Sequence, residues 1–132
     1  MLALSGLALQ GCQTSCGKSE DPVLWADGVT STNSGVETYL TTPIDGKWLH
    51  FPSYRSFRLP HHFGTTDIAL EAWVSFDEHP VTSNASDPPT EFAIAGGNVV
   101  VVTELTKDEL IVKNSTCENG YYLLARITKR GP

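Results

Sequence analysis

The run from Asp67 to Asp77 constrains the fold more than any other part of the chain. Within it, one set of residues alternates with another: Ile68, Leu70, Ala72, Val74 and Phe76 with Ala69, Glu71, Trp73 and Ser75. Residues two apart share a face of a β-strand, whereas a helix would separate Phe76 from Ile68. We therefore expect a strand over this run, with the two sets on opposite faces.

Seven other short runs have the same character, because each is rich in β-branched or aromatic residues and is bounded by turn-forming residues. They cover residues 36–42, 47–51, 55–59, 91–95, 99–105, 110–114 and 120–128. Such spacing, with no helical period, predicts an all-β fold, an antiparallel β-sandwich of about seven or eight strands. A small β-barrel is the alternative. Four consecutive valines (Val99–Val102) suit a strand that is buried on both faces or covered by a loop.

Length and charge narrow the classes of protein to consider. A chain of 132 residues holds about one domain. Fifteen Asp and Glu against nine Lys and Arg give a net charge of −6, which repels a phosphate backbone, so we expect no nucleic-acid partner. No run approaches the roughly 20 apolar residues that a membrane-spanning helix requires.

A short apolar run, residues 1–11, opens the chain and ends in small residues before Cys12. Such a run is typical of an export signal. The sequence Leu9-Gln10-Gly11-Cys12 resembles the lipobox of bacterial lipoproteins, with Cys12 in the place of the lipidated residue. The resemblance implies a signal peptide over residues 1–11, cleavage before Cys12 and acyl chains that anchor the protein to a membrane. Gln13 after the cysteine implies the outer membrane of the bacterial cell envelope.

The remaining organisation follows from this reading. Residues 12–22 form the lipidated N-terminus and a polar linker, and residues 23–132 form the β-sandwich domain. Lipidation of Cys12 leaves Cys16 and Cys117, an even pair in an oxidising compartment, and we expect a disulfide between them. A zinc site on Cys12 and Cys16 lacks a second pair of ligands. Residues 78–89, with three prolines and few apolar residues, predict an exposed loop.

The adjacent pair His61 and His62, at the end of a predicted strand, is the most specific chemical feature. Adjacent side chains of a strand point to opposite faces, so a shared metal requires a turn after Pro60. A catalytic zinc site would also need His50 or His79 and an open position for water. The alternative is structural, with one ring buried and its N–H bonded to a backbone carbonyl, and the other ring in water. We expect no metal and no other cofactor.

The same segment resembles a second pattern, the His-x-aliphatic-Gly strand-to-turn signature of β-sandwich domains at the tips of phage tail fibres and in some lectin-like modules. His61 or His62, Phe63 and Gly64 stand in the matching positions. The resemblance implies that the glycine forms the turn and that the histidine bonds to nearby backbone.

Aromatic residues are the better guide to binding. Seven of them concentrate in the first half of the domain: Trp25, Tyr39, Trp48, Phe51, Tyr54, Phe57 and Phe63. Flat rings with polar neighbours bind sugar rings and protein partners. The least core-like of them are Trp48 and Tyr54, which with His61 and His62 are the candidate ligand-binding residues.

No catalytic constellation accompanies these features. There is no Gly-x-Ser-x-Gly elbow, and Gly96-Gly97-Asn98 lacks the Lys-Ser/Thr of a phosphate loop. The sequence predicts a non-catalytic binding or structural module, anchored to the outer membrane by lipid, with an envelope protein or glycan as partner. The alternatives are a small metal-dependent hydrolase that uses His61 and His62, and a carbohydrate-binding lectin-like domain. Asn84 and Asn114 begin glycosylation sequons, whose machinery a bacterial lipoprotein does not normally meet.

Overall fold

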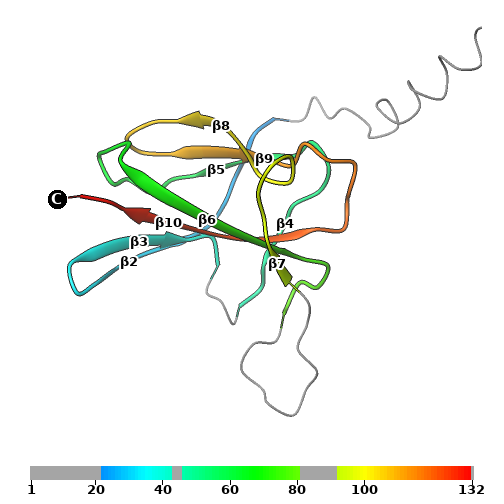
Figure 1. The fold of residues 1–132 in the computed structure, drawn as a ribbon, viewed down its shortest axis with the longest axis horizontal. Helices are drawn as coiled ribbons and strands as arrows, with labels where there is room; N and C mark the ends of the chain where they lie inside the picture. Colours follow the sequence, from blue (N-terminus) through cyan, green and yellow to red (C-terminus); the bar gives the residue numbers. More distant parts are fainter. Residues whose placement is uncertain (1–21, 43–45, 81–91, 132) are drawn as a thin grey trace, which may run out of the picture.

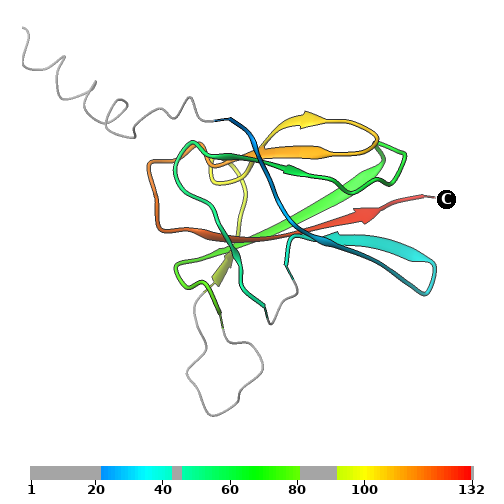
Figure 2. The ribbon, with the colours of Figure 1, turned by 180° about the vertical axis from the view of Figure 1, so that it is seen from behind.

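The computed structural model describes residues 22–42, 46–80 and 92–131, and this part of the chain is all β (Figures 1 and 2). The strands there are β1 (Leu24–Trp25), β2 (Val29–Asn33), β3 (Val36–Leu40), β4 (Leu49–His50), β5 (Ser56–Leu59), β6 (Ile68–Ser75), β7 (Phe92–Ile94), β8 (Val101–Leu105), β9 (Leu110–Lys113) and β10 (Tyr122–Lys129). The described residues include no helix of the length and apolarity needed to cross a membrane.

The strands form two layers, which lie one above the other in Figure 1. Sheet A has the strand order β1-β5-β9-β8, and sheet B has the order β2-β3-β10-β6-β7, with β4 also paired to β10. The strand pairs are antiparallel except β1 with β5, which is parallel. The sheets do not close into a barrel. The predicted all-β, sandwich-like fold is therefore confirmed, and the barrel alternative is wrong.

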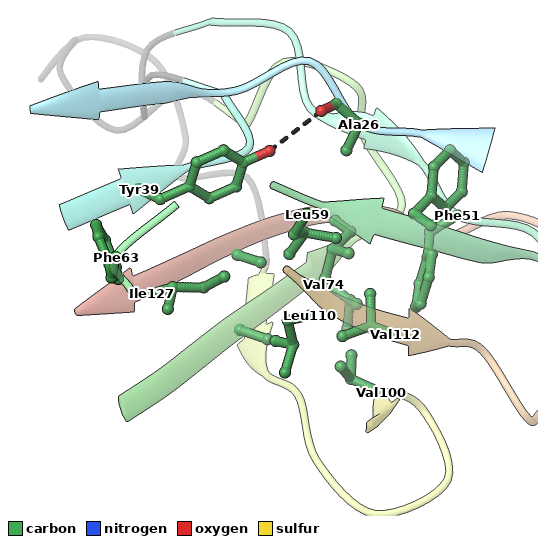
Figure 3. Close-up of a cluster of buried hydrophobic side chains, with 14 residues drawn as sticks. Ala26, Tyr39, Phe51, Leu59, Phe63, Val74, Val100, Leu110, Val112 and Ile127 are labelled. Atoms are coloured by element: carbon green, nitrogen blue, oxygen red, sulfur yellow. Dashed lines mark hydrogen bonds between the residues drawn. The ribbon is translucent and has the colours of Figure 1, made fainter. Parts of the chain in front are cut away.

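The hydrophobic core lies between the two sheets (Figure 3). Strands β6 and β10 are the longest and pair over eight residues, so they form the centre of sheet B. Alternate residues of β10 (Leu123, Ala125 and Ile127) are fully buried against inward-facing residues of sheet A, which include Leu59, Leu110 and Val112. Burial of alternate side chains is what a strand with one face toward the core produces.

The eight runs predicted from the sequence correspond to β3 to β10, with only Lys129 of β10 outside them, and the alternation in β6 places Ala72 and Val74 in the core. Phe76 follows the end of β6 and is 68% exposed, so the alternation stops one residue earlier than the sequence indicates. Strands β1 and β2 escape prediction because all their residues are exposed. Without a buried face, a strand carries no hydrophobic period.

The four valines do not form the doubly buried strand that their sequence predicts. Val100 is buried but precedes β8, which begins at Val101, and Val102 is 45% exposed. β8 is an edge strand of sheet A, and its register to β9 shifts between Val102 and Glu104. An edge strand whose outer face is open to solvent buries only part of an apolar run.

Candidate functional site

The histidine pair lies where the chain turns after β5. The backbone N–H of His62 donates to the carbonyl of Asp108 at 2.8 Å, and that of Gly64 donates to Lys107 at 2.9 Å. Both His62 and Gly64 have positive φ (57° and 73°). The segment is thus a left-handed turn held against the connection between β8 and β9, with Gly64 in the turn position that the strand-to-turn signature implies.

The His61 ring is structural. It is 1% exposed, lies 4.9 Å from the Phe63 ring, and its Nδ1 accepts the backbone N–H of Phe63 at 3.1 Å. An accepting Nδ1 is unprotonated, so the ring carries its proton on Nε2 and is neutral. Burial lowers the pKa of His61. His62 is exposed. The structural alternative predicted one buried ring and one ring in water, and His61 and His62 have this arrangement. It also predicted a ring N–H bonded to a backbone carbonyl, whereas Nδ1 of His61 accepts a backbone N–H. Burial of His61 contradicts its choice as a ligand contact.

The four histidines do not converge in the described structure. His50 pairs with Tyr122 at the start of β10, whereas His61 and His62 follow the far end of β5. No group of three or more His, Cys, Asp or Glu residues within the described ranges is arranged to hold a metal ion. The three-histidine site that the hydrolase alternative requires is therefore not assembled there.

The two aromatic candidates are less exposed than their sequence context predicts. Trp48 is only 2% exposed, and its backbone N–H donates to the carbonyl of Glu78 at 2.8 Å. Tyr54 is half-buried at a positive φ of 58°, with the Lys113 ammonium 5.1 Å from its ring centroid. The expectation that Trp48 lies outside the packed interior is therefore wrong.

A concave surface of the described chain lies along β4. Two adjacent hollows share Leu49 and His50 and together form what we term the β4 groove. One, of about 350 Å³, is lined by Trp25, Asp27, Thr41, Thr42, Lys47, Trp48, Leu49, His50 and Glu78. The other, of about 320 Å³, is lined by Leu24, Leu49, His50, Pro52, Arg55 and Phe57. Trp48 is the one predicted candidate that borders it.

Among the residues that line this groove, Trp25 is an exposed aromatic residue. It is 62% exposed, and the Arg58 guanidinium carbon lies 5.5 Å from its ring centroid. Trp25 and Arg58 are register partners in the parallel pair β1–β5, so the backbone pairing brings the cation to the ring. Cation–π contact of this kind holds the indole in place while leaving part of it open to a ligand.

His50 is oriented by the loop that precedes β10. Its Nε2 lies 2.9 Å from the carbonyl oxygen of Asn119. Because a carbonyl only accepts, Nε2 is the protonated nitrogen and Nδ1 is left to accept a hydrogen bond. The ring also packs at 5.1 Å from that of Tyr122. A fixed acceptor on an exposed strand is suited to recognising a hydroxyl or an N–H.

Charged groups border the groove on one side. Asp27 is exposed, and Lys47 Nζ lies 3.3 Å from Glu78 Oε2. Thr41 has a structural role, because its Oγ1 accepts a hydrogen bond from the Ala125 N–H at 3.0 Å. The groove therefore combines an aromatic residue, an oriented imidazole and charges of both signs, which fits a neutral polar ligand.

The sequence did not identify Trp25 and His50 as the main candidate ligand-binding residues. Trp25 belongs to the aromatic set, but nothing in a two-residue strand with both residues exposed shows that it borders a groove. The sequence points to His50 as a candidate metal ligand and as a neighbour of Trp48 on one strand face, and not as a ligand contact. The signal that the sequence does contain is the short stretch Trp48 to Phe51, in which aromatic, aliphatic and imidazole groups alternate.

The loop between β9 and β10 is organised by Asn114. This residue is fully buried, its Nδ2 donates to the carbonyls of Phe51 (2.9 Å) and Glu118 (3.0 Å), and its Oδ1 accepts from the backbone N–H and the hydroxyl of Thr116 (2.9 and 2.6 Å). Every hydrogen-bonding group of the amide is used. Asn114 is accordingly a structural residue, and its sequon offers no accessible nitrogen.

Several predicted features lie outside the described residues. These are the signal over residues 1–11, the lipidated Cys12, Cys16, the linker up to residue 21, and most of the predicted 78–89 loop with Asn84. Cys117 is an exposed residue of the β9–β10 loop and takes part in an interaction. The Cys16–Cys117 disulfide stays a prediction.

No model of a known protein family matches this chain, and neither does any curated protein or solved structure.

Proposed function

We propose that this protein is a non-catalytic binding module of the bacterial envelope and that its ligand occupies the β4 groove. The observation that carries the proposal is the pairing of an exposed, cation-held Trp25 ring with an oriented His50 on the same concave surface. Clefts with an apolar ring and a few fixed polar groups are where proteins bind small ligands. The His61 ring, by contrast, is packed into the turn after β5, and His62 is exposed.

Carbohydrate is the ligand class that this chemistry favours. A sugar ring has apolar C–H faces that stack on an indole, and its hydroxyls both donate and accept hydrogen bonds. Asp27 and the free Nδ1 of His50 accept such bonds, while Lys47 donates. A protein partner is the second candidate, since exposed Leu24 and Trp25 also suit an apolar side chain.

A glycan array followed by calorimetric titration of the full chain tests the site. We expect Trp25→Ala to weaken binding of the best glycan by about tenfold, the loss of one stacking contact. Phe76→Ala is the matched control, because Phe76 is also an exposed aromatic residue but lies outside the groove, against Tyr121. Binding that survives Trp25→Ala, or an array with no bound glycan, contradicts the carbohydrate assignment.

The envelope location rests on the lipobox and on cysteine usage. Acylation at Cys12 places the domain at the outer membrane, and the Cys16–Cys117 disulfide ties the tether to the β9–β10 loop. Cells grown with labelled palmitate should yield labelled protein, and Cys12→Ala should abolish the label. Equal labelling of the wild type and of Cys12→Ala would contradict lipidation at this residue.

A further inference from the structure

We propose that the free edge of β2 pairs with β2 of a second copy of this chain, in an antiparallel ladder centred on Ser31. β2 is the terminal strand of sheet B and pairs only with β3 among the described strands (Figure 1). An open edge carries backbone N–H and C=O groups that another strand can satisfy.

The edges of the described sheets are not equally open. Of the three other terminal strands, β1 has two residues and β7 has three. β8 has five residues, but it carries Glu104 and a register irregularity at that point. Short length, charge and bulges are the devices that prevent edge-to-edge pairing. β2 has five residues, Val-Thr-Ser-Thr-Asn, with no charge, no proline and an unbroken register to β3.

The turn after β2 determines which of its backbone groups face outward. Ser34 and Gly35 have φ of 53° and 80°, the signature of a two-residue type I′ hairpin. The hydrogen bond of such a turn joins Asn33 to Val36, and hydrogen-bonded and non-hydrogen-bonded pairs then alternate along the hairpin. Thr30 and Thr32 therefore direct their backbone N–H and C=O groups away from β3.

These outward groups are complementary to a second copy. When Ser31 faces Ser31, Thr30 of each copy opposes Thr32 of the other, and each of these two pairs exchanges two backbone hydrogen bonds. Threonine opposite threonine is a favourable cross-strand pair. Asp27, the charged residue that precedes β2 in the chain, falls opposite Gly35 in this register, so no charge opposes a like charge. A heterologous strand gains nothing from this symmetry, which is why we favour a second copy.

The register predicts a specific cross-link. Ser31 lies on the two-fold axis as a non-hydrogen-bonded pair, and the Cα separation of about 4.5 Å in such pairs is within reach of a disulfide. We expect Ser31→Cys in the full chain to give a covalent dimer on a non-reducing gel. Thr32→Cys, which does not oppose itself, should resemble the wild type and so controls for the native cysteines. A cross-link that is equal in both variants would overturn the register.

Charge exchange tests the same register without a covalent bond. Thr30→Lys with Thr32→Lys places like charges opposite each other twice and should weaken the dimer about tenfold in sedimentation equilibrium of the detergent-solubilised full chain. Thr30→Lys with Thr32→Glu places opposite charges in contact and should restore it. Circular dichroism confirms that both variants fold. A wild type that sediments as one chain at every concentration would overturn the proposal and would leave the β4 groove untouched.

Discussion

Individual side chains connect segments of the fold at positions where the sequence pattern does not predict a contact. Tyr39, which is 1% exposed, donates its hydroxyl to the carbonyl of Ala26 at 3.1 Å, which links β3 to the segment after β1 (Figure 3). Burial raises the pKa of Tyr39, so the phenol stays protonated and remains a donor. Gly28 lies against the same ring, where a side chain would have no room.

The contact with Tyr39 makes Gly28 the most sensitive glycine. A Cβ at this position would lie 2.2 Å from Cζ of Tyr39. Gly28→Ala should therefore lower the free energy of unfolding by about 1–3 kcal/mol, the usual cost of overpacking. Urea denaturation measures this loss. Gly96→Ala is the control, because a Cβ there meets no atom within 4 Å and its change should be close to zero. Equal effects at both positions would contradict the packing explanation.

Buried His61 gives the fold a pH dependence. Because its folded pKa is lowered, the unfolded chain takes up a proton first as the pH falls through the ordinary histidine pKa of about 6.5. Stability should thus be fully present above this pH and decline below it. His61→Asn, which keeps an acceptor and does not titrate, should reduce the difference in unfolding free energy between pH 7.5 and pH 5.5.

Exposed His62 provides the matched control for this comparison. His62→Asn should leave most of the pH dependence in place, because burial, and not the neighbouring His62 charge, is the largest cause of the lowered pKa of His61. A pH dependence that follows His62 rather than His61 would contradict the assignment.

At the scale of elements, the hairpin β2–β3 forms by turn chemistry rather than by a hydrophobic period. All five residues of β2 are exposed, and in β3 only Tyr39 is buried. The register is set by the two-residue turn at Ser34-Gly35. By contrast, β6 and β10 form because their alternate residues face the core.

Substitutions in the turn between β2 and β3 should change stability only through the backbone conformation that they favour. Gly35 has a φ of 80°, and a Cβ there meets no atom within 4 Å, so Gly35→Ala should cost only the left-handed penalty of about 1 kcal/mol. Ser34→Asn should raise stability slightly, because Asn-Gly is the preferred type I′ pair. The midpoint of thermal unfolding measures both changes. A stabilising Gly35→Ala would exclude this turn type.

At the scale of the whole molecule, the β4 groove exists because distant segments meet. The loop around Asn114 and Asn119 holds residues 50–53 in place, through His50 and through the Ser53 N–H, which donates to Asn119 Oδ1 at 3.1 Å. Cys117 lies in this loop. A disulfide from it to Cys16 would therefore anchor the N-terminal tether beside the wall of the groove.

Reduction of the purified protein tests that bridge. A disulfide that closes a loop of about 100 residues stabilises a fold by about 4 kcal/mol on the chain-entropy model. Dithiothreitol should lower the free energy of unfolding by an amount of this order, and Cys16→Ala should abolish the response. Cys12→Ala should retain it, which separates the two cysteines. Loss of the response in Cys12→Ala alone would mean that Cys12 is the bonded residue.

The all-β class and the eight strands β3 to β10 could be predicted from the amino-acid sequence, because a strand with one buried face has a local alternation of apolar and polar residues. Only the tertiary structure revealed β1 and β2, the burial of Trp48 and His61, and the groove along β4. Each of these depends on segments far apart in the chain: Trp25 meets Arg58 by parallel pairing, and Asn119 orients His50 from 69 residues away. The pattern of neighbouring residues in the sequence does not report such long-range contacts. The residues that line the groove could therefore be identified only from the assembled sheets.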